Sequence, residues 1–170
     1  MERAEKKEQA NKKLSTEVNT FPVSFAKQEI KENFTCKTNT PSKEQIINQA
    51  IQFHLQGNIQ EASKYYQKCL NLGFDDHRVF SNFGSILKSK GSLQNAEILL
   101  RKAIALKPDL AEAHYNLGNI LKDKKDIKQA EIEIRKAIEL KPDFAGAYVN
   151  LGIILRNLGK LKEAESSQRK

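Results

Sequence analysis

Residues 111–144 read AEAHYNLGNILKDKKDIKQAEIEIRKAIELKPDF, and residues 77–110 read HRVFSNFGSILKSKGSLQNAEILLRKAIALKPDL. Each stretch is 34 residues long, and the two carry small or apolar side chains at the same places. The pattern extends toward both ends of the chain in steps of 34. Its clearest columns are Ala62, Ala96, Ala130 and Ala164; Gly84, Gly118 and Gly152; and Phe53, Leu87, Leu121 and Leu155. A fixed period of this length indicates an array of repeated structural units.

Each unit is predicted to consist of two helices. Within residues 111–144 the apolar side chains twice follow the i, i+3, i+4, i+7 spacing of an amphipathic helix. Pro108 and Pro142 come after the second helix of their units, and proline cannot continue a helix. Asp109 and Asp143 are expected to cap the following helix by accepting hydrogen bonds from its first free amides. The sequence therefore predicts an all-α chain of stacked helical hairpins.

These columns resemble the tetratricopeptide repeat, whose pattern is an aromatic residue, Leu-Gly, Tyr or a similar residue, Ala, an aromatic residue, Ala and Pro. The resemblance covers about three quarters of the chain. It implies a right-handed α-solenoid in which the first helix of each unit lines the concave side. The predicted units are 43–76, 77–110, 111–144 and an incomplete 145–170. Gly73-Phe74, Lys125 and Gln168 depart from the pattern, where a proline, a glycine and a large apolar residue are expected.

Residues 1–42 differ from the repeats, because Lys, Glu, Asn, Thr and Ser dominate them. Such a segment buries too little apolar surface to order itself, so we predict a flexible, largely disordered N-terminal arm. The stretch from Phe21 through Ile30 to Phe34 is more apolar. We expect it to dock against the first repeat as a cap, and the alternative is a short binding motif.

The formal net charge is +8, but basic residues are interleaved with acidic ones and form no unbroken run. Because aromatic side chains are not interleaved with Lys or Arg on one face, nucleic acid is disfavoured as a partner. No stretch is apolar over the length of a bilayer, and Met1–Lys13 lacks the apolar segment of a signal peptide. The sequence predicts a cytoplasmic protein that does not bind a membrane.

One polar column stands directly before the Leu-Gly position of every unit, and its members are Asn48, Asn82, Asn116 and Asn150. It resembles the asparagine ladder in the repeat arm of O-linked N-acetylglucosamine transferases. A carboxamide offers an acceptor and two N–H donors, so it can pair with a peptide unit of an extended ligand whatever its side chains are. The alternative is that each Asn bonds to neighbouring helix backbone and fixes the stacking.

A second column carries a basic or ionisable group in every unit, namely His54, Lys88, Lys122 and Arg156. Such groups favour acidic or carboxylate-bearing partners. The alternative is an ordinary row of solvated side chains. Tyr115 and Asn119 lie beside Asn116 on the same predicted helix and complete the candidate peptide-binding residues.

We expect no catalytic residues, metal or cofactor in this chain. Cys36 and Cys69 lack partners at metal-ligand spacing, the three histidines do not cluster, and the glycines have structural places in the repeats. The sequence therefore predicts a scaffold that binds an extended or acidic segment of another polypeptide. The alternative is the targeting arm of a truncated, transferase-type protein whose catalytic domain is absent here. The incomplete last unit also allows self-association through the C-terminal repeat.

Overall fold

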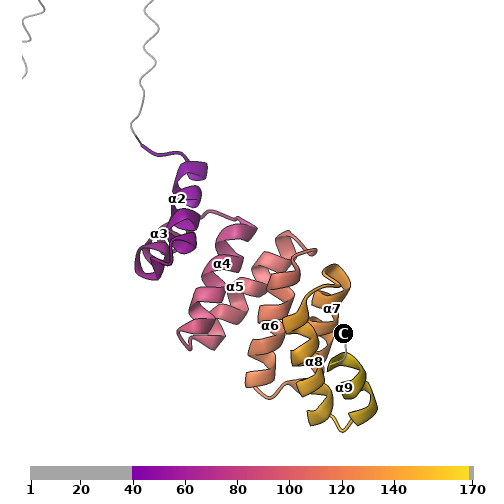
Figure 1. Ribbon diagram of the computed structural model, residues 1–170. Coiled ribbons are helices and arrows are strands. Elements are labelled where there is room, and N and C mark those ends of the chain that lie inside the picture. Colours follow the sequence, from indigo (N-terminus) through magenta and orange to yellow (C-terminus); the bar gives the residue numbers. More distant parts are fainter. Residues whose placement is uncertain (1–39, 169–170) are drawn as a thin grey trace, which may run out of the picture. The chain divides into compact units, whose positions relative to one another are not determined.

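The computed structural model describes residues 40–168. Residues 1–39 of the predicted N-terminal arm therefore lie outside the described residues. The described residues form eight helices and no strand (Figure 1). The helices are α2 (Lys43–Leu55), α3 (Ile59–Asn71), α4 (His77–Ser89), α5 (Leu93–Leu106), α6 (Ala111–Asp123), α7 (Ile127–Leu140), α8 (Ala145–Asn157) and α9 (Leu161–Gln168). Consecutive helices pack in pairs, which we call hairpins 1 to 4: α2–α3, α4–α5, α6–α7 and α8–α9. The predicted all-α solenoid of helical hairpins is confirmed.

The turn inside each hairpin has the same backbone geometry. Its residues with positive φ are Gly57, Gly91, Lys125 and Gly159. In hairpin 3 the amide of Asp126 donates to the carbonyl of Leu121 at 2.9 Å, and the amide of Lys125 donates to the carbonyl of Lys122 at 3.0 Å. This pair of bonds is a Schellman motif, which satisfies the last free carbonyls of α6. Lys125 therefore adopts, at φ 69°, a conformation that glycine reaches more easily.

The linkers between hairpins take two forms. After α3, Gly73 has a φ of +70° and ends the helix, and the Asp76 side chain caps α4 by accepting from the amide of Arg78 at 2.9 Å. The later helices α6 and α8 follow Leu110 and Phe144, which make no side-chain cap hydrogen bond.

The expected caps by Asp109 and Asp143 are wrong. The N-cap residues of α6 and α8 are Leu110 and Phe144, so each aspartate lies one residue too early. A cap requires the side-chain oxygen at the residue immediately before the helix, where it reaches the amides of the first turn. Asp76 meets this condition in the first linker, where the helix begins directly after it.

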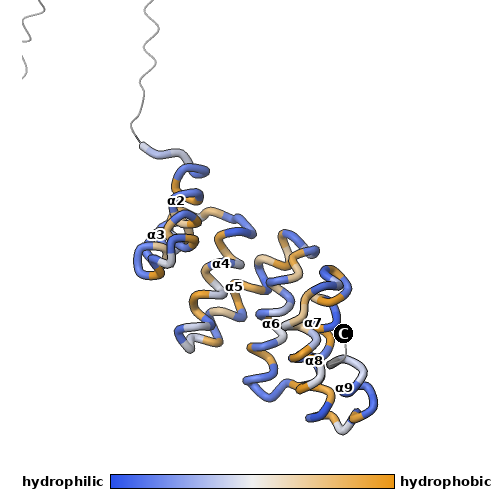
Figure 2. The backbone as a smooth tube through the Cα atoms, viewed as in Figure 1, coloured by the Kyte–Doolittle hydropathy of each residue, from blue (hydrophilic) through white to orange (hydrophobic). Residues whose placement is uncertain are grey.

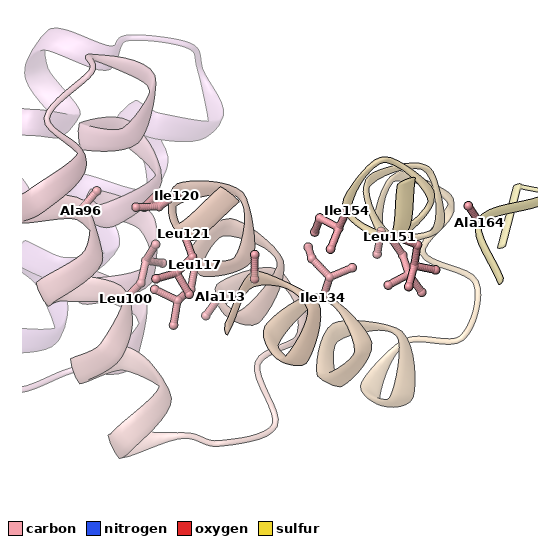
Figure 3. Close-up of a cluster of buried hydrophobic side chains, with 13 residues drawn as sticks. Ala96, Leu100, Ala113, Leu117, Ile120, Leu121, Ile134, Leu151, Ile154 and Ala164 are labelled. Atoms are coloured by element: carbon pink, nitrogen blue, oxygen red, sulfur yellow. The ribbon is translucent and has the colours of Figure 1, made fainter. Parts of the chain in front are cut away.

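Hydrophobic residues recur along the helices with polar residues between them (Figure 2). The buried ones form two clusters, one in α2 to α5 and one from α5 to α9. Figure 3 shows the second cluster, in which Ile134 of α7 and Ile154 of α8 lie beside each other. Leu87 and Leu110 pack against both clusters, so the core is continuous from hairpin to hairpin. None of the described helices is both long and apolar enough to traverse a bilayer.

The first helices of neighbouring hairpins lie side by side, with α4 next to α6 and α6 next to α8. The second helices of neighbouring hairpins approach each other less, and each packs instead against the first helix of the next hairpin. A stack of hairpins bends toward the side on which its helices are closest. We therefore call the face formed by α2, α4, α6 and α8 the inner surface.

Candidate functional site

Five of the predicted peptide-binding residues meet on the inner surface, and we call them the inner cluster: Lys88, Tyr115, Asn116, Asn119 and Asn150. The Lys88 ammonium donates to Asn116 Oδ1 at 2.6 Å and lies 6.0 Å from the centroid of the Tyr115 ring. The Asn150 amide donates to the Tyr115 hydroxyl at 3.0 Å and to Asn119 Oδ1 at 2.7 Å. These residues come from α4, α6 and α8, so the cluster joins three successive hairpins.

The inner cluster keeps hydrogen-bonding capacity for a ligand. All five side chains are half-buried. Within residues 40–168, Asn116 uses its amide oxygen and Asn150 uses its amide nitrogen. The Asn116 N–H groups and the Asn150 oxygen therefore offer donors and an acceptor of the kind that one peptide unit requires.

Lys88 is the cation of the inner cluster. Burial lowers its pKa, while the neighbouring Asp123 acts in the opposite direction. Its hydrogen-bond partner within the described residues is the neutral Asn116. A half-buried ammonium without a carboxylate partner gains from an incoming anion, because a charge-assisted hydrogen bond is stronger than a neutral one.

The other two asparagines of the column, Asn48 and Asn82, lie outside the inner cluster. Burial raises the pKa of Tyr66 to about 12, and the neighbouring Asn82 acts in the opposite direction. Asn48 is exposed, and the pKa of Glu44, four residues earlier on α2, is lowered mainly by its bond with Arg78. Two of the four asparagines hydrogen-bond to a side chain of the preceding hairpin: Asn116 with Lys88, and Asn150 with Tyr115.

The basic column is not uniform in the structure. Lys122 lines a cavity of about 620 Å³ at the end of α6, together with Ile153 and Asn157 of α8. Arg156 is exposed. His54 Nδ1 lies 3.5 Å from the Tyr66 hydroxyl, and burial lowers the pKa of His54. A neutral His54 cannot act as a cation at this end of the column.

One apolar member of the inner surface and one His–Glu pair were not predicted from the sequence. Val149 takes the place of Tyr115 one repeat later, and its side chain is 53% exposed. The spacing of 34 could have identified it. The pairing of His114 with Glu133 at 2.7 Å had no such signal, because neither residue repeats in its column. Among residues 40–168, no group of three or more His, Cys, Asp or Glu side chains is placed to hold a metal ion.

This geometry defines a helical-repeat protein with an accessible polar inner surface. Models of the tetratricopeptide repeat match residues 84–125, residues 53–73 and 111–144, and residues 133–166. The chain belongs to the tetratricopeptide-repeat family, and its fold is that of a protein-interaction scaffold. No curated protein sequence matches the chain significantly.

Several solved structures are similar to the chain. A crystal structure of MamA is 24% identical, with a TM-score of 0.68 and 75% of each chain covered. The structure of YrrB, described as a TPR protein with an unusual peptide-binding site, is 19% identical, with a TM-score of 0.65, and the match covers 74% of this chain and 65% of that one. The O-GlcNAc transferase of Thermobaculum terrenum, as a K341M mutant, is 26% identical, with a TM-score of 0.59, over 66% of this chain and 22% of that one.

Proposed function

We propose that the chain is a scaffold that binds an extended, acidic segment of another protein along its inner surface. The four asparagines hold the backbone of the segment, and Lys88, Lys122 and Arg156 attract its carboxylates. Tyr115 and Asn119 complete the contact surface. The chain needs no catalytic group or cofactor for this role, and we place it in the cytoplasm.

The observation that carries this proposal is the inner cluster. It spans three first helices, it leaves amide donors and an acceptor unused within the described residues, and it contains a cation with a neutral partner. The peptide-binding site named for YrrB supports a ligand of the same class, since the two chains share the fold. The contacts between hairpins add rigidity, because residues already held in place lose less entropy when a ligand binds.

The proposal is tested with short peptides selected from a displayed library on the immobilised full chain. Binding of each selected peptide is then measured by fluorescence anisotropy with the wild type and with the double variant Asn116→Ala, Asn150→Ala. Each lost hydrogen bond contributes on the order of 1 kcal/mol, so the dissociation constant should rise at least about tenfold. Gln60→Ala is the matched control, because Gln60 is an exposed amide on the second helix α3.

The peptide side provides an independent measurement. If asparagine amides hold the backbone, methylating alternate backbone nitrogens of a selected peptide abolishes binding, whereas replacing its neutral side chains by alanine changes affinity little. Lys88→Gln should weaken acidic peptides more than neutral ones, with the exposed Lys128→Gln as control. Equal affinities for the wild type and the double asparagine variant, with both folded by circular dichroism, would reject the proposal.

The match to the Thermobaculum terrenum enzyme favours a second candidate function, that of a targeting arm joined to a transferase domain. This chain covers 22% of that enzyme, in its repeat region by fold. The coding sequence next to the codon of Lys170 decides between the two. An adjoining in-frame transferase domain would support the targeting arm, and a stop codon there would leave the scaffold alone.

A further inference from the structure

A second groove lies outside the inner surface, between the second helices of hairpins 1 and 2. Phe83 and Leu87 of α4 form its floor, and α3 and α5 form its walls. Two cavities of about 570 Å³ and about 230 Å³ share Gln67, Phe83 and Leu87, so they adjoin each other. We call the whole the α3–α5 groove.

The α3–α5 groove exposes apolar side chains on its walls. Leu72 at the end of α3 is 51% exposed, and Ile98 on α5 is 46% exposed. Leu70 and Leu99 are more buried and extend the apolar lining. An apolar surface that continues from the rim to the floor of a groove is a feature of interaction sites rather than of ordinary protein surface.

At the later junctions, ion pairs bridge neighbouring hairpins beside the corresponding space. Between hairpins 2 and 3, the Lys124 ammonium lies 2.6 Å from the Glu97 carboxylate. Between hairpins 3 and 4, Arg135 of α7 lies 2.9 Å from Glu163 of α9. At the first junction, Lys90 takes the place of Lys124 in the repeat, and its ammonium bonds to the uncharged hydroxyl of Ser63 at 2.9 Å.

A cavity of about 320 Å³ does remain between hairpins 3 and 4. Its lining differs, because Arg135 and Glu139 bring both signs of charge and Ser166 and Ser167 stand where Ile98 and Leu99 stand in the first groove. The α3–α5 groove is therefore the more apolar of the two.

The lining of the α3–α5 groove carries positive charge, although one of its lysines, Lys64, also pairs with Glu61 at 2.6 Å outside the lining. Lys64, Lys68 and Lys90 line the larger cavity, and all three are exposed. The residues that line the two cavities include no Asp or Glu. A positive rim around an apolar floor is complementary to a segment in which carboxylates flank large apolar side chains.

We propose that the α3–α5 groove is a second docking site, for a partner protein segment that carries large apolar side chains flanked by Asp or Glu. The apolar side chains enter over Phe83 and Leu87, and the carboxylates pair with the rim lysines. This site differs from the inner cluster, because α3 and α5 supply its walls and its floor is apolar. A flat lipid surface fits it poorly because the floor lies between two helices.

The probe is a displayed peptide library selected on the full chain whose inner surface is disabled by Asn116→Ala, Asn150→Ala. Selected peptides should place Leu, Ile or Phe next to Asp or Glu. Ile98→Glu puts a carboxylate on the apolar wall and should weaken these peptides at least about tenfold. Ile132→Glu is the matched control, because Ile132 holds the same place one repeat later and is 59% exposed.

Charge is tested separately with Lys64→Glu, Lys90→Glu, which should weaken the same peptides and reduce the salt dependence of their affinity. Equal weakening by Ile98→Glu and Ile132→Glu, or selection of basic peptides, overturns the proposal. A selection that returns no Ile98-dependent peptide overturns it as well. Tighter peptide binding after removal of residues 1–39 would assign the groove to this chain's own N-terminal segment, and Ile98-dependent binding of phosphatidylserine vesicles would assign it to a membrane.

Discussion

The junction between hairpins 1 and 2 and the junction between hairpins 2 and 3 use the same apolar columns but are held together differently. At the first, fully buried Tyr66 stacks on Phe83 with ring centroids 5.9 Å apart, and Arg78 bonds to both carboxylate oxygens of Glu44. At the second, Leu100 takes the place of Tyr66 in the core, while α4 and α6 approach more closely than α2 and α4. The repeat therefore sets which positions pack in the stack, and the side chains at those positions and between them set each junction.

Tyr66→Ala should have the largest effect and should show whether the first junction is the weaker one. Truncating a fully buried aromatic residue costs about 3–5 kcal/mol. Within residues 40–168, hairpin 1 packs on the rest of the stack mainly through hairpin 2, so the loss should fall mainly on α2 and α3. Hydrogen exchange should show faster exchange there, with α6 and α7 still protected.

Leu100→Ala is the matched change at the second junction. It should cost about 2–5 kcal/mol and increase exchange on both sides, because hairpin 2 has neighbours at both ends. Uniform loss of protection from α2 to α9 in Tyr66→Ala would mean that the stack unfolds as one unit and that the two junctions do not differ in strength.

Ala130→Leu tests the part of the structure that the two regions share. Ala130 is fully buried where α6 crosses α7, and a Cβ added to the facing Gly118 would lie 2.7 Å from Cγ1 of Ile134. Overpacking there should cost about 1–3 kcal/mol. Ala62→Leu, in the same column of hairpin 1, should cost a similar amount. Thermal denaturation of both variants measures this, and an unchanged melting temperature would mean that the helix pairing is wrong.

The fold could be predicted from sequence because close helix crossings demand small residues. Gly118 and Ala130 repeat every 34 residues for this reason, and the helical spacing between them follows. The caps could not be predicted in the same way. Asp109 and Asp143 recur in their column, but capping depends on the backbone of the next residue, which spacing does not report.

The candidate site was predictable to the level of the helix face. The column placed Asn116 and Asn150 on successive first helices, and the structure brings both into the inner cluster. Their partners were not predictable, because the Lys88–Asn116 and Tyr115–Asn150 bonds depend on how closely neighbouring hairpins approach. Whether these asparagines bind a peptide remains a prediction for the anisotropy measurements.

His114 gives hairpin 3 a histidine–carboxylate pair that hairpin 2 lacks, because Phe80 occupies its place there. His114 Nδ1 lies 2.7 Å from Glu133, and Nε2 lies 3.0 Å from the carbonyl oxygen of Pro108. Both neighbours accept hydrogen bonds, so both ring nitrogens carry protons. The bond to Glu133 raises the pKa of His114, while burial opposes this.

A raised pKa in the folded state stabilises the fold fully below the unfolded value of 6.5, and this contribution is lost as pH rises through the folded value. The contribution of this pair to the free energy of unfolding should therefore fall from mildly acidic to alkaline pH. His114→Phe should remove this fall. Urea denaturation at several pH values across this range measures the free energy of unfolding. The same change with pH in wild type and variant would show that the pair does not titrate with folding.

Lys125→Gly should have the smallest effect, and it should stabilise the protein. Lys125 has a φ of 69° at the turn of hairpin 3, where hairpins 1, 2 and 4 have Gly57, Gly91 and Gly159. The left-handed conformation costs a residue with a side chain about 1–2 kcal/mol, and replacing it by glycine removes this cost. Glycine also makes the unfolded chain more flexible, which offsets part of the stabilisation. We expect a net gain of about 0.5–1 kcal/mol, measured as a higher urea midpoint with an unchanged slope. The reverse change at the matched turn, Gly91→Lys, should lose a similar amount, and a loss at Gly91 without a gain at Lys125 would mean that the Lys125 side chain stabilises hairpin 3 by contacts of its own.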